Sequence, residues 1–209
     1  MPDAPLFLLS SHMSITFLRH WLQDPTAVGA IAPSSRHLAA AMADGAANFD
    51  AIVEIGAGTG AITESLVTRH PNVQLVVFEL ASSLADNLRA RFPAAQVISG
   101  PFHENVSALD ALPERTVVVS ALPFRSLPRR VVRPTVEALA TFMRAAPDRH
   151  LMQFSYRLQA PFVAPEDFEW RRVTTVWRNA PPANVWQLSR QLWMDNDRQS
   201  RVSDAMVRR

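Results

Sequence analysis

A glycine-rich turn between an apolar run and a helical pattern constrains this chain more than any other feature. Gly56, Gly58 and Gly60 stand at every second position, directly after the apolar run at 51–55. That run suits a strand buried on both faces of a parallel sheet. Glycine accepts unusual backbone dihedrals and leaves no Cβ between chain and ligand, and the following helix adds free N–H donors. The turn therefore predicts a site where a polar or anionic ligand group lies against the backbone.

Two ligand classes use a turn of this kind. Gly56, Gly58 and Ala61 fit the G-x-G-x-x-G/A pattern of dinucleotide-binding folds. Enzymes that use S-adenosylmethionine (SAM) typically show an acidic residue and then G-x-G-x-G, and Glu54 with the three glycines fits that pattern. In those enzymes the carboxylate helps to orient the methionine portion of the ligand. The SAM pattern is favoured because it also explains Gly60 and a carboxylate inside an apolar strand.

A second carboxylate follows at a suitable distance. The segment QLVVFEL contains Glu79, which is placed to accept hydrogen bonds from both hydroxyls of a ribose. Nicotinamide dinucleotide sites use an acid in the same way, so Glu79 does not separate the two ligand classes. Leu80, the next residue, is assigned to the same cofactor site.

Strand-like and helix-like segments alternate along the chain, as in a doubly wound parallel sheet. Strands are predicted near 51–55, 74–79, 95–98, 116–121 and 150–156, and helices near 13–23, 34–43, 60–69 and 82–91, with a long one ending near 144. Two β-rich segments, 170–177 and 185–193, then follow without a helix between them, and a final hairpin of this kind is usual in Class I methyltransferase sheets. We expect N-terminal helices in 1–45, a SAM-binding core in 46–195 and a tail in 196–209.

Composition excludes several kinds of chemistry. The chain has no cysteine, so disulfides, a thiol nucleophile and a thiolate metal site are excluded, and no metal is expected. It also has no lysine, since all 21 basic residues are arginine, which excludes Schiff-base mechanisms. No apolar stretch reaches the roughly 20 residues of a membrane span, and the start lacks the basic residues of a secretory signal. We expect a cytoplasmic protein, soluble or peripheral on the inner membrane.

The predicted fourth strand leads into a candidate acceptor loop, because ligands of open α/β sheets bind at the carboxyl ends of the strands. Amine-directed methyltransferases commonly carry N/D-P-P-Y/F or N-L-P-Y/F there, and the polar first residue and backbone carbonyls hold the target nitrogen. Here the tetrad reads Ala121-Leu122-Pro123-Phe124. The side chain that would hold the amino group of a base is therefore absent.

Taken together, five tracts give the chain a family resemblance. They are FLRHWLQDPTAVGAIAPSSRHLAAAM, VEIGAGTGAIT, SALPFRSLP, LMQFSY and NAPPANVWQLSR. The chain resembles the bacterial phospholipid N-methyltransferases that act on phosphatidylethanolamine, whose core is similar to that of the rRNA adenine dimethylases. The resemblance implies a Rossmann-like Class I methyltransferase with a mostly parallel seven-stranded sheet, and SAM-dependent methylation of an ethanolamine-type amine. The SAM positions that it implies are Ser34, Glu54, Gly56, Gly58, Gly60, Glu79, Ser120 and Leu122.

One departure concerns the adenine end of the cofactor. Many relatives have Gly-Asp-Ala after the third strand, and that aspartate accepts from the adenine amino group. This chain reads Gly100-Pro101-Phe102 instead, so the acid is missing. We keep these three residues as cofactor-binding and expect either Glu104 or a backbone carbonyl to replace the acid, with Phe102 packed on the adenine.

Methyl transfer is an in-line displacement, so the enzyme must chiefly align nitrogen, methyl carbon and sulfur. Tyr156, the only tyrosine, ends the fifth strand, and it could orient the amine and face the methylated cation, or simply pack with its hydroxyl in water. Phe124 is either a pocket wall or a packing residue. His103 and Glu104 are candidate proton acceptors, or solvated loop residues.

Membrane access would suit a lipid substrate. Met13, Phe17 and Trp21 share one stripe of a predicted helix, which either lies in the headgroup interface or packs over the sheet. The arginines at 125, 129, 130 and 133 either bind lipid phosphates or form a solvated helix face. No oligomeric state is predicted.

Alternative functions are methylation of an RNA adenine or of a small molecule, and SAM binding without catalysis. Ala121 and the lack of an appended RNA-binding domain argue against RNA. No nucleic-acid partner is therefore expected.

Overall fold

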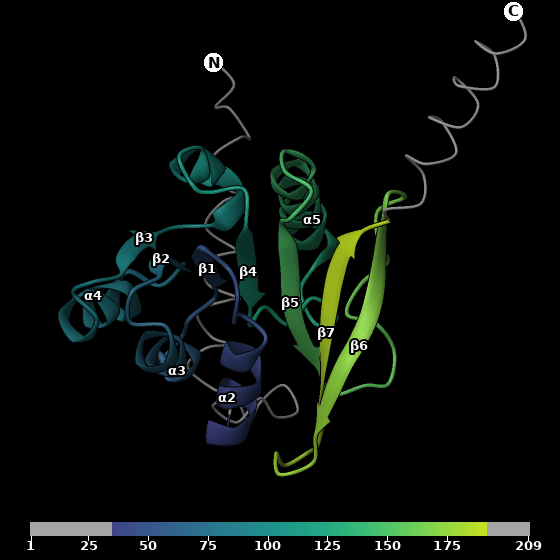
Figure 1. Cartoon of the computed structure of the whole chain (residues 1–209), viewed down its shortest axis with the longest axis horizontal. Helices are drawn as coiled ribbons and strands as arrows, with labels where there is room; N and C mark the ends of the chain where they lie inside the picture. Colours follow the sequence, from purple (N-terminus) through teal and green to yellow (C-terminus); the bar gives the residue numbers. More distant parts are fainter. Residues whose placement is uncertain (1–34, 192–209) are drawn as a thin grey trace, which may run out of the picture.

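The computed structural model describes residues 35–191, which form a seven-stranded mixed sheet in the order β3-β2-β1-β4-β5-β7-β6 (Figure 1). The strands are β1 Ala51–Ile55, β2 Gln74–Glu79, β3 Gln96–Ser99, β4 Thr116–Ser120, β5 His150–Ser155, β6 Phe168–Val176 and β7 Ala183–Arg190. β1 to β5 pair in parallel, whereas β7 runs antiparallel to both β5 and β6. The predicted parallel sheet with a C-terminal antiparallel hairpin is confirmed.

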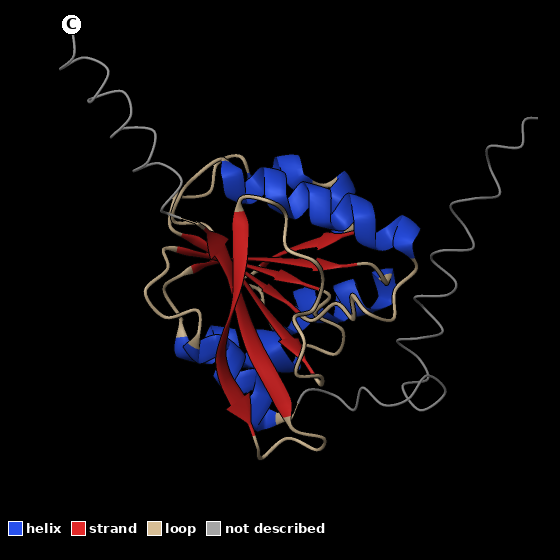
Figure 2. Ribbon diagram, turned by 90° about the vertical axis from the view of Figure 1, so that its right-hand side faces the viewer, coloured by secondary structure: helices blue, strands red, loops and turns tan. Residues whose placement is uncertain are grey.

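Helices cover both faces of this sheet (Figure 2). The structure contains α2 Arg36–Asp44, α3 Ala61–Arg69, α4 Ser82–Arg91, α5 Arg129–Arg144 and the short 3-10 helices η1 Phe102–Glu104 and η2 Val106–Leu109. Buried side chains of α2, α3 and α4 join one core cluster, and those of α5, η1 and η2 join the other. We call these two sides the α3 face and the α5 face.

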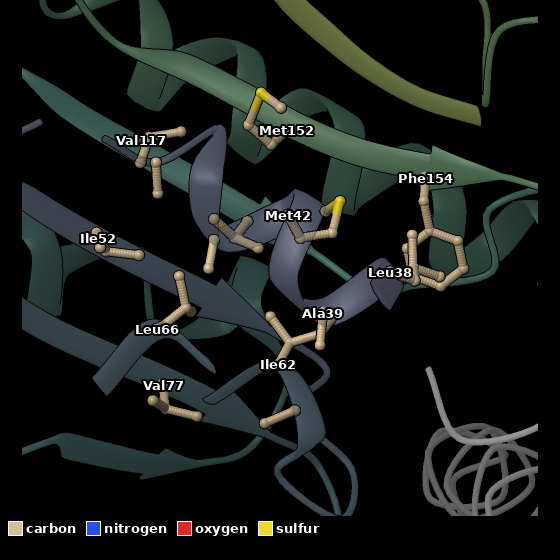
Figure 3. Packing of buried hydrophobic residues seen from close by; sticks show 14 of the residues in the cluster. Leu38, Ala39, Met42, Ile52, Ile62, Leu66, Val77, Val117, Met152 and Phe154 are labelled. Carbon is tan, nitrogen blue, oxygen red and sulfur yellow. The ribbon is translucent and has the colours of Figure 1, made fainter. Parts of the chain in front are cut away.

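The central strands are apolar on both sides because each side faces helices. Every residue of β1 and of β4 is buried. Alternate residues separate onto the two faces: Ile52 and Val117 point to the α3 face, whereas Val53 and Val118 point to the α5 face. Figure 3 shows how Leu38, Met42, Ile52 and Leu66 meet on the α3 face. Because nearly every residue of these strands is buried, each strand is a mostly apolar run in the sequence, and this run made the strands predictable.

Two boundaries differ from the prediction. The Ser35 side chain caps α2 by accepting from the Leu38 amide at 3.3 Å, so the cap is one residue later than Ser34. Ser34 itself lies outside the described residues, as does the predicted helix at 13–23. The hairpin strands both begin two residues earlier than predicted, at Phe168 and Ala183, because the pairing between them includes these residues, with Phe168 opposite Arg190 and Ala183 opposite Val176.

Within residues 35–191, no helix combines the length and apolar character that crossing a membrane requires.

Candidate active site

The three glycines of the turn have left-handed backbone conformations with φ values of 76°, 57° and 86°. A Cβ on Gly56 would lie 2.9 Å from Leu122 Cδ2, and one on Gly60 would lie 2.8 Å from Leu88 Cδ2. A Cβ on Gly58 would meet no atom of residues 35–191 within 4 Å. The outer two glycines therefore permit close packing of the protein itself, whereas the middle one leaves open space beside the backbone.

Glu79 joins the end of β2 to this turn. Its side chain is buried, and Oε2 accepts from the Gly58 amide at 2.7 Å while Oε1 accepts from the Ala81 amide at 2.9 Å. Each carboxylate oxygen keeps a second lone pair, so the group can still accept from ribose hydroxyls. The Gly100 amide donates to the Glu79 backbone carbonyl at 3.0 Å, which brings the loop after β3 to the same place.

Glu54 is fully buried in β1. Its Oε2 accepts from Thr63 Oγ1 at 2.6 Å, and its Oε1 has no hydrogen-bond partner among the described residues. Burial raises the pKa of Glu54 to about 8; the Thr63 hydrogen bond opposes the rise and the charge of Glu79 adds to it. A buried carboxylate oxygen without a partner is costly, and it fits a ligand ammonium group such as that of a methionine moiety.

The loop after β3 is held by a residue that sequence reasoning missed. Asn105 Nδ2 donates to the Pro101 carbonyl at 2.8 Å. Phe102 is 3% exposed and packs edge-on against Phe78, with ring centroids 5.3 Å apart, so its ring belongs to the core of the α5 face. Glu104 is exposed and lies 3.8 Å from His103 Nε2. Neither Phe102 nor Glu104 therefore has a contact that marks it as an adenine ligand.

The acceptor loop after β4 is closed by internal hydrogen bonds. Ser120 Oγ accepts from the Leu122 amide at 3.2 Å. The Leu122 carbonyl accepts from the Phe124 amide and from Gln153 Nε2, each at 3.0 Å. Both lone pairs of this carbonyl are thereby used, and Ala121 supplies no side-chain acceptor. Gln153, buried in β5, was not predicted as a site residue, although a glutamine inside an apolar strand was a usable signal.

Phe124 packs in an aromatic group on the α5 face. It is 5% exposed, and its ring lies 4.7 Å from that of Phe162. Arg125 donates to the Ala160 carbonyl and to Gln159 Oε1, both at 2.8 Å. These contacts tie the acceptor loop to the loop 156–167. The position of Phe124 is explained by packing and does not require a contact with substrate. The position of Arg125 is explained by its contacts with the loop 156–167 and does not require a lipid phosphate.

Tyr156 follows β5 and packs against the core of the α3 face, the face that also carries Glu54. Its ring lies edge-on to Phe154 at 5.7 Å. Burial raises the pKa of the Tyr156 hydroxyl, and a hydrogen bond with the Asn179 side chain opposes the rise. Asn179 also accepts from the Ser35 amide at 3.3 Å, so the hairpin turn, Tyr156 and the start of α2 meet here.

His103 is placed elsewhere. Its Nδ1 lies 3.4 Å from Thr135 Oγ1 of α5. The structure therefore groups Glu54, Glu79, Gly58 and Tyr156 around the carboxyl ends of the strands, and it gives His103 a neighbour on the opposite face of the sheet.

Comparisons with known proteins define the class. Residues 13–112 match the family model of ribosomal RNA adenine dimethylase. The chain is 29% identical over 182 residues to an ornithine lipid N-methyltransferase of Singulisphaera acidiphila, covering 81% of this chain and 92% of that protein. It is 27% identical to ribosomal RNA small subunit methyltransferase A of Chromobacterium violaceum, over 61% of this chain and 46% of that protein, so it spans about half of that relative.

Solved structures share the fold. The 1,6-didemethyltoxoflavin-N1-methyltransferase of Burkholderia thailandensis, solved with S-adenosylhomocysteine bound, has a TM-score of 0.58 at 14% identity and covers 91% of this chain and 93% of its own. The 23S rRNA methyltransferase ErmE has a TM-score of 0.51 at 20% identity and covers 76% of this chain and 69% of its own. The protein is a SAM-dependent methyltransferase with a Rossmann-like Class I fold.

SAM is its cofactor, and the site geometry fits it. The open space beside Gly58, the buried carboxylate of Glu79 and the partnerless oxygen of Glu54 match its ribose and methionine ends. The predicted alternatives of a nicotinamide site and of SAM binding without catalysis are not supported.

One prediction is wrong. We expected no nucleic-acid partner, but the matching family model and two of these similar proteins are named for methylation of ribosomal RNA. The absence of a side-chain acceptor at position 121 bears only on how the amino group of a base would be held. It does not exclude RNA as a partner.

Proposed function

We propose that this enzyme methylates the amine nitrogen of a lipid, and that ornithine lipids and phosphatidylethanolamine are the candidate substrates. The similarity to the ornithine lipid N-methyltransferase supports the proposal, because it extends over 92% of that protein. The similarity to the rRNA methyltransferase covers only 46% of its length.

The observation that carries the proposal is that the acceptor loop lacks a side-chain acceptor at Ala121 and a free carbonyl at Leu122. To hold the weakly basic amino group of an adenine, the loop would use a polar first side chain and the following carbonyl. Here Ala121 offers no acceptor, and the Leu122 carbonyl already accepts from Phe124 and Gln153. An alkyl amine is nucleophilic once deprotonated, so it needs alignment with the methyl group more than activation. The loop therefore favours an alkyl amine.

Each residue of the site has a role in this reaction. SAM, when bound, supplies an electrophilic methyl group. Glu79 would accept from the ribose hydroxyls and Glu54 would pair with the methionine ammonium. The amine would use its lone pair to take up the methyl group, with S-adenosylhomocysteine as the leaving group, and the nitrogen would then lose its extra proton to solvent.

Tyr156 orients the incoming amine. Because its pKa is raised, the hydroxyl stays protonated at neutral pH and acts as a hydrogen-bonding group and not as a base. The electron-rich face of its ring stabilises the cationic product.

RNA is the second candidate, favoured by the family model over residues 13–112. The test is methyl transfer from radiolabelled SAM to ornithine lipid, to phosphatidylethanolamine and to ribosomal RNA, each alone, with Glu79→Ala as the inactive control. We expect label in a lipid that carries a primary amine and none in its fully methylated analogue. Label in RNA alone would overturn the proposal.

A further inference from the structure

Three large apolar side chains are the most exposed of their kind among residues 35–191. Leu158 is 76% exposed, Val163 is 91% exposed and Trp177 is 78% exposed. We call these three residues the apolar rim. Large apolar side chains usually lie inside a fold, so an exposed group beside a functional site calls for an explanation.

Strand directions place Trp177 at the edge that carries the site. β5 and β6 both run antiparallel to β7, so they run parallel to each other and end at the same edge. Trp177 directly follows β6, and Tyr156 directly follows β5. Asn184 Nδ2 also donates to the Arg157 carbonyl at 3.1 Å, next to Leu158. Figures 1 and 2 show that the β6–β7 turn extends past the end of β5.

Val163 is exposed on a loop that is firmly held. The neighbouring Phe162 packs against Phe124 and against Trp170, with ring centroids 4.7 Å and 5.0 Å away. Trp170 Nε1 also donates to the Phe162 carbonyl at 3.0 Å. Arg125 of the acceptor loop fixes the same loop at 159–160. The fold therefore holds Val163 outward beside the acceptor loop.

Two of the rim residues, Leu158 and Trp177, are flanked by positive charge. Arg157 precedes Leu158 and Arg178 follows Trp177, and both arginines are exposed. Within residues 35–191, neither forms an ion pair with a carboxylate, in contrast to Arg133 and Arg144. Apolar side chains next to unneutralised guanidinium groups are complementary to a surface that has an apolar interior and anionic headgroups.

We propose that the apolar rim docks the enzyme onto a lipid bilayer that contains anionic lipids, so that headgroups reach Tyr156. This inference rests on the proposed lipid substrate. RNA would use the arginines and stack a base on Trp177, but aliphatic side chains such as Leu158 and Val163 offer no ring for stacking. All three rim residues, in contrast, gain from contact with acyl chains.

The test is flotation of the full-length protein with phosphatidylglycerol-containing vesicles, compared with pure phosphatidylcholine vesicles. The main variants are Trp177→Ala and the double variant Leu158→Ser with Val163→Ser. We expect each to weaken binding to the anionic vesicles by about tenfold. The double variant Arg157→Gln with Arg178→Gln removes two charges, and we expect a loss of about tenfold or more that disappears at high salt.

One control matches the charge change. Arg89→Gln alters an exposed arginine of α4 that pairs with Asp86. It should bind vesicles like the wild type. Circular dichroism and unchanged cofactor affinity would show that the rim variants are folded.

Methyl transfer to lipid in detergent micelles separates this inference from the proposed function. If rim variants keep micellar activity but lose activity on vesicles, both stand. If they bind vesicles like the wild type, the docking role is overturned, whatever the activity. If they lose RNA binding but not vesicle binding, the rim is a nucleic-acid surface and the inference also fails. Rim-dependent vesicle binding without any lipid methylation would support docking and refute the proposed substrate.

Discussion

The carboxylate of Glu79 binds the glycine turn directly, because its Oε2 accepts a hydrogen bond from the Gly58 amide at 2.7 Å. Its Oε1 accepts from the Ala81 amide at 2.9 Å, so one side chain fixes both the turn and the start of α4. The group that is to hold the ribose thus also shapes the backbone beside it.

Glu79→Gln should therefore lower both stability and cofactor affinity. An amide can accept at only one of its two polar atoms, so one half-buried backbone N–H loses its partner at a cost of about 1 kcal/mol. We expect S-adenosylhomocysteine to bind at least about tenfold more weakly, as measured by titration calorimetry, since one ribose acceptor is also lost. Wild-type affinity in a folded Glu79→Gln protein would contradict the ribose assignment.

Gly58→Ala and Gly60→Ala should separate binding from packing. At Gly58 a methyl group meets no atom of the described residues within 4 Å, so the stability cost is the left-handed strain of about 1 kcal/mol, but the methyl group occupies the space beside the turn. At Gly60 the methyl group also lies 2.8 Å from Leu88 and 3.0 Å from Phe92, which adds about 1–3 kcal/mol. Thermal unfolding and cofactor titration should rank the two variants in opposite order, and equal cofactor affinity in Gly58→Ala and wild type would be evidence against the site.

The buried Glu54 predicts a specific pH dependence of stability. Its pKa is raised from 4.5 to about 8, so the folded protein holds a proton that the unfolded chain has lost in this interval. The bound proton contributes its full stabilisation of the folded state below about pH 4.5. As the pH rises from about 4.5 to about 8, this contribution falls by about 1.4 kcal/mol per pH unit. Urea unfolding across this pH range should show a decline in the free energy of unfolding. Glu54→Gln should remove the part of the decline that comes from this carboxyl group.

The same residue predicts proton release when cofactor binds. A ligand ammonium beside the partnerless Oε1 favours the ionised carboxylate, so binding of S-adenosylhomocysteine at pH 7 should release a proton. Calorimetry in buffers with different ionisation enthalpies measures this directly. A binding enthalpy that is independent of the buffer would show that Glu54 does not meet the ammonium.

Tyr156→Phe should slow methyl transfer by about tenfold without changing cofactor affinity, since it removes one hydrogen bond to the amine and keeps the ring. Tyr156→Ala should be slower still, because the ring that faces the cation is lost as well. Single-turnover rates on micellar lipid would show the order. Equal rates for the wild type and Tyr156→Phe would leave the tyrosine a packing residue.

Local patterns in the sequence predicted the scaffold well. The burial of β1 and β4 on both faces left a clear apolar signal. The glycine turn with Glu54 and Glu79 predicted a cofactor site at the carboxyl edge of the sheet, and the role of these residues stays a prediction. Strand ends in the hairpin were displaced by two residues, since pairing between β6 and β7 and not local propensity decides where they start.

The partners that residues meet across the fold were not predictable, even where the residue itself left a signal in the sequence. Gln153 reaches the Leu122 carbonyl from 31 positions away, and only the packing of β5 beside β4 brings them together. The packing of Phe102 on Phe78 also depends on distant residues, because the loop after β3 turns its ring into the core of the α5 face, and its place beside the adenine stays a prediction. Trp177 is 78% exposed just after the last residue of β6, and sequence periodicity did not specify this exposure.

The most direct measurement of the lipid assignment is a competition for limiting labelled SAM. Ornithine lipid in micelles and ribosomal RNA would be present together with the full-length enzyme, and label would be counted in the organic and aqueous phases. We predict label in the organic phase, abolished in Glu79→Ala. Label confined to the RNA would contradict the lipid assignment and identify the enzyme as an RNA methyltransferase.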